Sequence, residues 1–77
     1  MISFINWIRE RTIITKDVQE SEVLNRISAD SNFPQTVKKW EILNYLDSQK
    51  FKKSEINIVD IYYHEFIKYI SHAVPQH

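Results

Sequence analysis

The chain has 77 residues and no glycine, so every corner of its backbone must be turned by residues that carry a side chain. The sharpest constraint lies in the stretch ADSNFPQT, residues 29–36. Pro34 cannot donate a backbone hydrogen bond and biases Phe33 away from helical geometry, which ends any preceding helix near residue 31 or 32. Asn32 is therefore predicted to adopt the left-handed cap conformation, because asparagine tolerates a positive φ better than most residues. Phe33 is predicted to point into the core.

Apolar residues recur at spacings of three and four along most of the chain, which indicates amphipathic helices. The expected helices cover residues 4–12, 18–30, 37–48 and 58–73. Each is preceded by a side chain that can accept a hydrogen bond from the first turn, and the predicted N-caps are Ser3, Asp17, Thr36 and Asn57.

The connections between these helices are short. A β-branched run at residues 12–15 resists helix and predicts a connector, and Pro75 is expected to close the last helix. Four helices with short connections predict one all-α domain over residues 1–77, a compact four-helix bundle. The third expected helix has more apolar side chains than one narrow stripe requires, so we expect it to be the most buried element. These side chains are Trp40, Ile42, Leu43, Tyr45 and Leu46.

The charge and composition restrict the class of protein. Ten Lys and Arg residues balance ten Asp and Glu residues, whereas proteins that capture nucleic acid by overall charge usually have a basic excess. A local basic patch is still compatible with this balance. No stretch approaches the roughly 18 apolar residues of a membrane helix, and the start lacks the pattern of a signal peptide. The absence of cysteine is typical of a reducing compartment, so a cytoplasmic protein without membrane contact is expected.

No motif for catalysis, cofactor binding or metal binding stands out in the sequence. His64 and His72 would lie about 12 Å apart along one helix, too far to share a zinc ion without a ligand between them. The carboxylates occur mostly at expected helix starts, where the helix dipole favours them. A bundle of this size rarely has room for a substrate pocket. We therefore expect no enzymatic activity, cofactor, metal ion or small-molecule substrate.

Five lysines form the candidate site for nucleic acid. Lys38 and Lys39 open the third expected helix, where positive charge opposes the helix dipole, so helix stability does not explain them. Lys50, Lys52 and Lys53 follow in the next connector. A helix N-terminus with adjacent cations can hold a phosphate group. The alternative interpretation is a solvated loop whose charges only keep the protein soluble.

The tyrosines of the last expected helix form the candidate site for a protein partner. Tyr62, Tyr63 and Tyr69, together with Phe66, supply more aromatic surface than one buried stripe requires. Tyrosine tolerates both water and contact with protein, which makes it common at interfaces. The alternative interpretation is that these tyrosines cover a small core with their hydroxyl groups in solvent.

Four stretches also carry a family resemblance: SF near the start, DSNFPQT, WEILNYLD and IVDIYYHEFIKY, which together reach from Ser3 to about Tyr69. They resemble the YozE family of small Firmicutes proteins. The acidic residue that this family has before its Phe-Pro pair is matched by Asp30. The remaining matches lie in the last two expected helices, at Ile42, Tyr45, Leu46, Asp47, Val59 and Asp60.

The chain departs from the family pattern in two places. Tyr62 or Tyr63 stands where the family commonly has tryptophan, and the corner before the third helix is a residue shorter, so the resemblance is to a distant member. It implies a fold similar to the sterile alpha motif. Because folds of this kind bind protein, DNA or RNA, the resemblance does not select a function.

Two hypotheses follow from the sequence. The first is a protein-interaction module, either for a partner or for self-association, that uses the aromatic side chains of the third and fourth helices. The balanced charge and surplus apolar surface favour it. The second is a DNA-binding module that uses the five lysines and whose affinity would fall steeply with salt.

Overall fold

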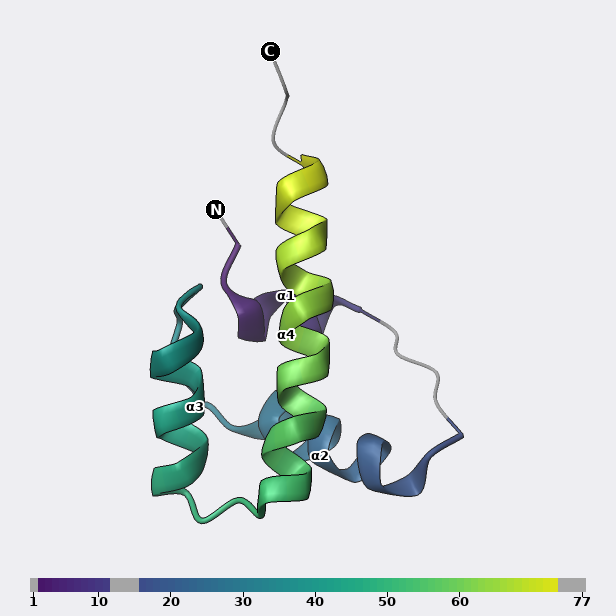
Figure 1. Cartoon of the computed structure of the whole chain (residues 1–77), viewed down its shortest axis with the longest axis vertical. Helices are drawn as coiled ribbons and strands as arrows, with labels where there is room; N and C mark the ends of the chain where they lie inside the picture. The colour runs from purple at the N-terminus through teal and green to yellow at the C-terminus, as the bar shows by residue number, and fades with distance from the viewer. Residues whose placement is uncertain (1, 12–15, 74–77) are drawn as a thin grey trace.

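Four helices make up the structure, a computed structural model that describes residues 2–11 and 16–73: α1 (Phe4–Glu10), α2 (Val18–Ala29), α3 (Lys39–Ser48) and α4 (Lys53–Ala73). α4 runs along the length of the molecule, α3 lies beside it, and α1 and α2 cross behind it (Figure 1). α4 contacts each of the other three helices, and α1 also contacts α2. The predicted all-α four-helix bundle is therefore confirmed. The expected connector at residues 12–15 and the expected stop at Pro75 lie outside the described residues. None of the four described helices is long and apolar enough to cross a membrane.

An aromatic cluster around Phe4 forms the centre of the core. Phe4 is fully buried, and its ring centroid lies 5.6–6.4 Å from those of Trp7, Phe33, Tyr63 and Phe66. Tilted and edge-on ring pairs of this kind add about 0.5–1.5 kcal/mol each beyond the burial of their area. Phe4 of α1 therefore contacts both α4 and the loop that follows α2.

The first two helices begin where the sequence predicts. Ser3 Oγ and Asp17 Oδ1 each accept a hydrogen bond from the backbone N–H three residues further on, at 3.3 and 3.0 Å. The start of α1 is also joined to the loop before α3, because the Phe4 N–H donates to the Thr36 carbonyl at 3.1 Å. These bonds place Phe4 in the core.

Asp30 builds the corner after α2. It follows the helix with an extended backbone (φ −83°, ψ 106°), and its Oδ1 accepts from the Asn32 N–H at 2.9 Å. Its carbonyl accepts from the Phe33 N–H at 3.3 Å. Among the described residues only Lys50 has a positive φ, so the prediction of a left-handed Asn32 is wrong. An acceptor side chain two residues upstream turns the backbone instead. Phe33 is buried, as predicted.

Lys50, with a φ of 62°, occupies the left-handed position directly after α3. Its N–H donates to the Asp47 carbonyl at 3.0 Å, and the Phe51 N–H donates to the Leu46 carbonyl at 3.1 Å. These two bonds form a Schellman motif, whose left-handed position is usually glycine. A residue with a Cβ atom is strained there, so this is the corner at which the lack of glycine costs stability.

Replacing Lys50 with glycine is expected to raise the free energy of unfolding by about 0.5–1 kcal/mol, because relief of the left-handed strain exceeds the added entropy of the unfolded chain. Urea denaturation followed by circular dichroism measures the change. Asn44→Gly, an exposed position inside α3, is the matched control and is expected to lower stability. A Lys50→Gly protein no more stable than wild type would contradict the prediction.

α3 begins later than predicted. Its N-cap is Lys38, which has no side-chain cap hydrogen bond, so the prediction of Thr36 as N-cap is wrong. Thr36 Oγ1 instead accepts from the Lys38 N–H at 3.1 Å and donates to Glu41 Oε1 at 2.7 Å. The threonine therefore forms the turn before the helix, and that turn delays the first helical residue to Lys39.

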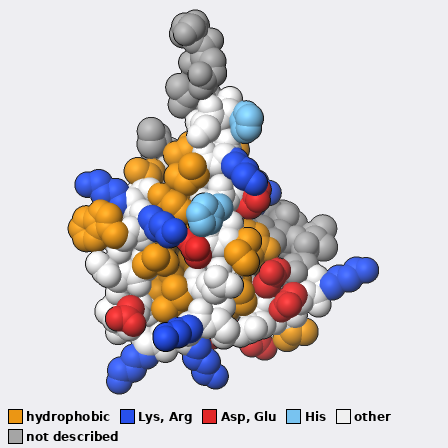
Figure 2. All heavy atoms as spheres, viewed as in Figure 1, with side chains coloured by type: hydrophobic (Ala, Val, Ile, Leu, Met, Phe, Trp, Pro, Cys, Tyr) orange, Lys and Arg blue, Asp and Glu red, His pale blue; other side chains and the backbone are white. Residues whose placement is uncertain are grey.

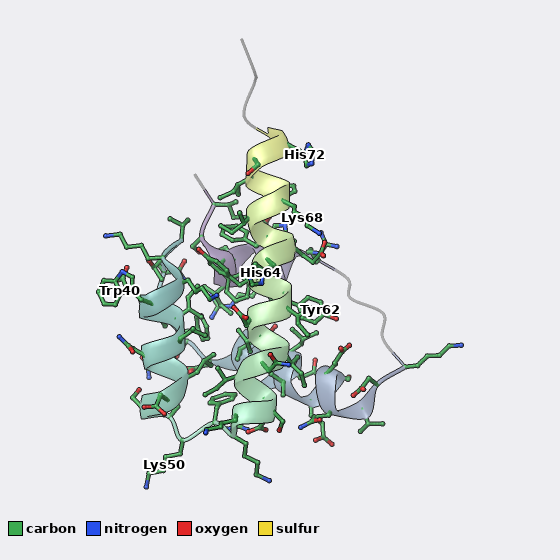
Figure 3. All side chains as sticks on the ribbon, viewed as in Figure 1. Trp40, Lys50, Tyr62, His64, Lys68 and His72 are labelled. Carbon is green, nitrogen blue, oxygen red and sulfur yellow. The ribbon has the colours of Figure 1, made fainter. Side chains whose placement is uncertain are left out.

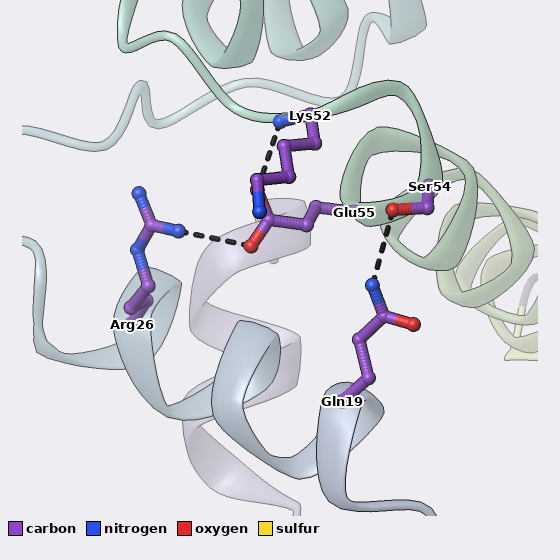
Figure 4. Close-up of polar contacts among 5 residues, drawn as sticks. All are labelled: Gln19, Arg26, Lys52, Ser54 and Glu55. Carbon is purple, nitrogen blue, oxygen red and sulfur yellow. Dashed lines mark hydrogen bonds and ion pairs between the residues drawn. The ribbon is translucent and has the colours of Figure 1, made fainter.

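α4 begins earlier than predicted, at Lys53, so Asn57 lies inside the helix and does not cap it. Glu55 Oε1 accepts from the Lys52 N–H at 2.8 Å, and Glu55 Oε2 pairs with Arg26 Nη1 of α2 at 3.1 Å (Figure 4). A carboxylate in the third helical position thus satisfies the N–H before the helix, as in half of a capping box. Because it also binds α2, this start depends on tertiary contact.

Candidate protein-binding surface

Trp40 on α3 is the largest exposed aromatic side chain in the described structure. It is 62% exposed, and only Ile42 and Leu46 of α3 are buried, so the prediction that α3 is the most buried helix is wrong. Trp40 and Ile42 are two residues apart, or about 200° around a helix, so both cannot face the core. Figure 3 shows Trp40 on the outer side of α3. Ile42 and Leu46 are four residues apart and share the buried face of α3, and this spacing in the sequence could have indicated that Trp40 is exposed.

A solvent-open groove of about 250 Å³ lies along the seam between α3 and α4. We call it the α3–α4 groove; its lining residues are Lys39, Leu43, Lys53, Ile56, Asn57 and Asp60. Figure 2 shows hydrophobic atoms along this seam with basic side chains around it. Trp40 follows Lys39 and lies one turn before Leu43, which places it next to the groove on the solvent side of α3. Sequence reasoning missed the groove because it requires the packing of two helices.

Two of the lysines in the groove differ in their charge environment. Lys39 Nζ lies 3.1 Å from Asp60 Oδ1, so part of its charge is neutralised by α4. This ion pair explains a lysine at the start of α3, where the helix dipole disfavours it. Lys53 forms no ion pair within the described residues. The groove therefore keeps one unneutralised positive charge at its Lys53 end.

The five predicted lysines form two groups. Lys38 and Lys39 lie at the start of α3, whereas Lys50, Lys52 and Lys53 surround the turn that follows it. The ten residues of α3 separate the groups by about 15 Å. Figure 3 shows Lys50 at the far end of α3 from its first turn. The α3–α4 groove is the feature that joins the two groups, through Lys39 and Lys53.

The three predicted tyrosines lie in different environments. Tyr63 is buried, and its hydroxyl donates to the Val37 carbonyl at 2.7 Å, so it packs inside the domain. Tyr62 is half-buried, its hydroxyl is 3.4 Å from Glu20 Oε2, and burial, followed by the charge of Glu20, raises its pKa. Tyr69 is 47% exposed, and its ring centroid lies 6.1 Å from that of Trp7.

Tyr62 and Tyr69 face away from the groove. They are seven residues apart, or two helical turns, and therefore share one face of α4. Tyr62 follows the groove residue Asp60 by two positions, which is about 200° around the helix. Figure 3 shows Tyr62 on the side of α4 away from α3. The tyrosine face and the α3–α4 groove are thus two separate surfaces.

Asp30 and Tyr45, two positions of the family resemblance, meet at the corner between α2 and α3. The Tyr45 hydroxyl donates to Asp30 Oδ2, and this hydrogen bond is the main cause that lowers the pKa of Asp30 and raises the pKa of Tyr45. Arg9 Nη2 of α1 donates to the Asp30 carbonyl at 2.7 Å. Through these bonds, Asp30 links the end of α2 to α1 and to α3.

At neutral pH, Tyr45→Phe is expected to lower the free energy of unfolding by about 1 kcal/mol, less than is usual for a hydrogen bond to a charged group, because the site is partly exposed. The folded pKa of Asp30 lies below its ordinary 3.8, so the ionised carboxylate stabilises the fold above that pH. This contribution is lost as the pH falls through the folded pKa, and the difference between Tyr45→Phe and wild type should shrink accordingly.

Urea denaturation at neutral pH and at about pH 2.5 tests this pH dependence. Tyr62→Phe is the matched control, because the Tyr62 hydroxyl makes only a long hydrogen bond, at 3.4 Å. An equal loss of stability in Tyr45→Phe at both pH values would show that Asp30 ionisation is not involved.

Comparison with known proteins assigns no function to this surface. Protein-family models, curated proteins and solved structures all returned no match to this chain.

Proposed function

We propose that this protein is a non-enzymatic interaction module that binds a segment of another protein in the α3–α4 groove. The observation that carries the proposal is an exposed tryptophan beside a groove with an apolar floor: Trp40 is 62% exposed, and Leu43 and Ile56 line the groove. Tryptophan is among the residues most enriched in interface hot spots, especially next to pockets that exclude water when filled.

The size of the groove favours a protein segment over a small molecule. Pockets for drug-sized ligands usually enclose about 300–1,000 Å³ and cover most of the ligand. The α3–α4 groove is smaller, about 250 Å³, and open to solvent. A few side chains of a peptide fill such a site while the rest of the segment contacts its rim, where Trp40 lies.

The resemblance to the YozE family supports the class of protein and not the ligand. We propose that the chain is a distant member of the YozE family with a sterile-alpha-motif-like arrangement. Since folds of this kind serve several types of binding, the choice of protein as ligand depends on Trp40 and the groove.

Trp40→Ala is expected to weaken ligand binding at least about tenfold while changing the free energy of unfolding by less than about 1 kcal/mol. The ligands are peptides selected from a random displayed library on the immobilised wild-type protein. Their dissociation constants are then measured by fluorescence anisotropy. Tyr69→Ala is the matched control, because Tyr69 is also an exposed aromatic residue but lies on the other face of α4.

Two outcomes would contradict the proposal. Peptides that bind Trp40→Ala as tightly as wild type but lose affinity for Tyr69→Ala would place the interface on the tyrosine face. Failure to select any peptide, together with salt-sensitive binding of a DNA duplex that Lys52→Glu/Lys53→Glu abolishes, would make the protein a DNA-binding module.

A further inference from the structure

The two lysines of the α3–α4 groove mark its opposite ends. Lys39 lies level with Asp60, because their side chains form an ion pair at 3.1 Å. Lys53 precedes Asp60 by seven residues of α4, which is two helical turns or about 10 Å along the axis. Leu43 and Ile56 line the groove together with these two lysines. A bound segment would therefore meet an unpaired positive charge at the Lys53 end, apolar side chains in the middle, and the Lys39–Asp60 ion pair at the other end.

The positive charge at these ends is only partly neutralised by the protein. Asp60 is the one carboxylate among the lining residues, and it already pairs with Lys39. Two further carboxylates lie close to the Lys53 end: Asp47, one turn beyond Leu43, and Glu55, which accepts from the Lys52 N–H and already pairs with Arg26. Three lysines outnumber Asp47 at that end, and none of them forms an ion pair within the described structure. These lysines are Lys50, Lys52 and Lys53.

From this arrangement we infer that the groove takes an acidic peptide segment, in which a short apolar stretch is joined, on the Lys53 side, to aspartate or glutamate. The inference rests on the proposed function and names its partner class. Charge complementarity selects the acidic residues at the Lys53 end, and the apolar floor selects the apolar stretch.

An apolar floor argues against a nucleic acid as the occupant. Phosphate groups gain from lysine but not from contact with leucine or isoleucine, and a duplex presents charge about every 1.7 Å along its axis. The groove offers one unpaired lysine, Lys53, beside an apolar surface, and its other end carries the Asp60 carboxylate. This arrangement fits a peptide with carboxylates at one end better than a continuous row of phosphates.

The test uses the library-selected peptides and the 77-residue chain. We expect the selected peptides to carry Asp or Glu next to an apolar pair. Lys39→Glu/Lys53→Glu is expected to weaken their binding at least about tenfold at low salt, and replacing the acidic residues of the peptide with lysine is expected to restore it. Lys16→Glu/Lys68→Glu makes the same change in net charge at exposed lysines outside the groove and is expected to leave binding within about twofold.

A second variant separates binding from folding. Lys39→Glu removes the partner of Asp60, so the protein is also tested as Lys53→Gln, which breaks no ion pair of the described structure. Lys53→Gln is expected to weaken the acidic peptides about threefold to fivefold with unchanged circular dichroism.

The outcomes distinguish this inference from the proposed function. Peptides that require Trp40 but have no acidic excess, or that ignore the Lys39 and Lys53 changes, overturn the acidic partner and leave the interaction module standing. Peptides that bind without Trp40 overturn both. A wild-type mass in light scattering that is a multiple of the chain mass, and that Trp40→Ala reduces to the monomer, would make the occupant a second copy and overturn the acidic peptide.

Discussion

Replacing Phe4 with alanine is expected to lower the free energy of unfolding by about 3–5 kcal/mol, which would leave much of this small domain unfolded at room temperature. Phe4 is fully buried in α1, and its ring packs against Phe33 in the corner after α2 and against Phe66 of α4. The cavity left by alanine therefore removes contacts to three parts of the chain at once. Urea denaturation followed by circular dichroism, with added glycerol if the variant is unfolded in buffer, measures the loss.

Trp40→Ala is the matched control for Phe4→Ala. It removes a larger aromatic side chain, but from a position that is 62% exposed, so its cost should stay below about 1 kcal/mol. Similar losses in the free energy of unfolding of the two variants would mean that Trp40 packs in the core. That result would contradict its exposed position and the proposed binding surface.

Phe33→Ala is expected to cost about 3–4 kcal/mol, because Phe33 is only 2% exposed and closes the corner from inside. Its ring centroid lies 6.4 Å from that of Phe4 and 5.2 Å from that of Tyr45, the second in an edge-on arrangement. Pro34→Ala is the control and should change stability by less than about 1 kcal/mol, mainly through the unfolded chain.

These two variants also decide the role of the Phe-Pro pair. If Phe33→Ala were as stable as wild type, Phe33 would be free to act as a recognition element. If Pro34→Ala cost as much as Phe33→Ala, the fixed φ of proline, rather than the buried ring, would hold the corner. Chemical denaturation of both variants under the same conditions separates these cases.

The parts of the fold that could be predicted depend on contacts between residues near in sequence. Ser3 and Asp17 cap their helices through the N–H three residues away, so the local pattern was sufficient. The starts of α3 and α4 could not be predicted in this way. Thr36 is used by a turn that also binds the start of α1, and Glu55 binds both its own helix and Arg26 of α2. A local rule does not include partners from other helices.

The candidate site shows the same division. Lys39 and Lys53 were selected from the sequence as basic residues, but the sequence pattern could not show that they lie at two ends of one groove. Tyr63 was selected as a surface aromatic and is instead hydrogen-bonded inside the domain, whereas Trp40 was expected in the core and is exposed. Aromatic residues satisfy both a core pattern and an interface pattern, so only their packing distinguishes the two.

The sequence by itself determined that this protein is an all-α bundle, that its first two helices are capped by Ser3 and Asp17, and that Phe33 is buried, because spacing, capping and proline act over a few residues. Only the tertiary structure decided that Asp30 builds the corner in place of Asn32 and that Lys50 takes the left-handed position. It also decided which aromatic side chain remains exposed beside the α3–α4 groove. The Asp30 corner is also held by Arg9 of α1 and Tyr45 of α3, and the exposure of Trp40 depends on how α3 packs against α4. Packing between helices distant in sequence is the information that a local pattern does not contain.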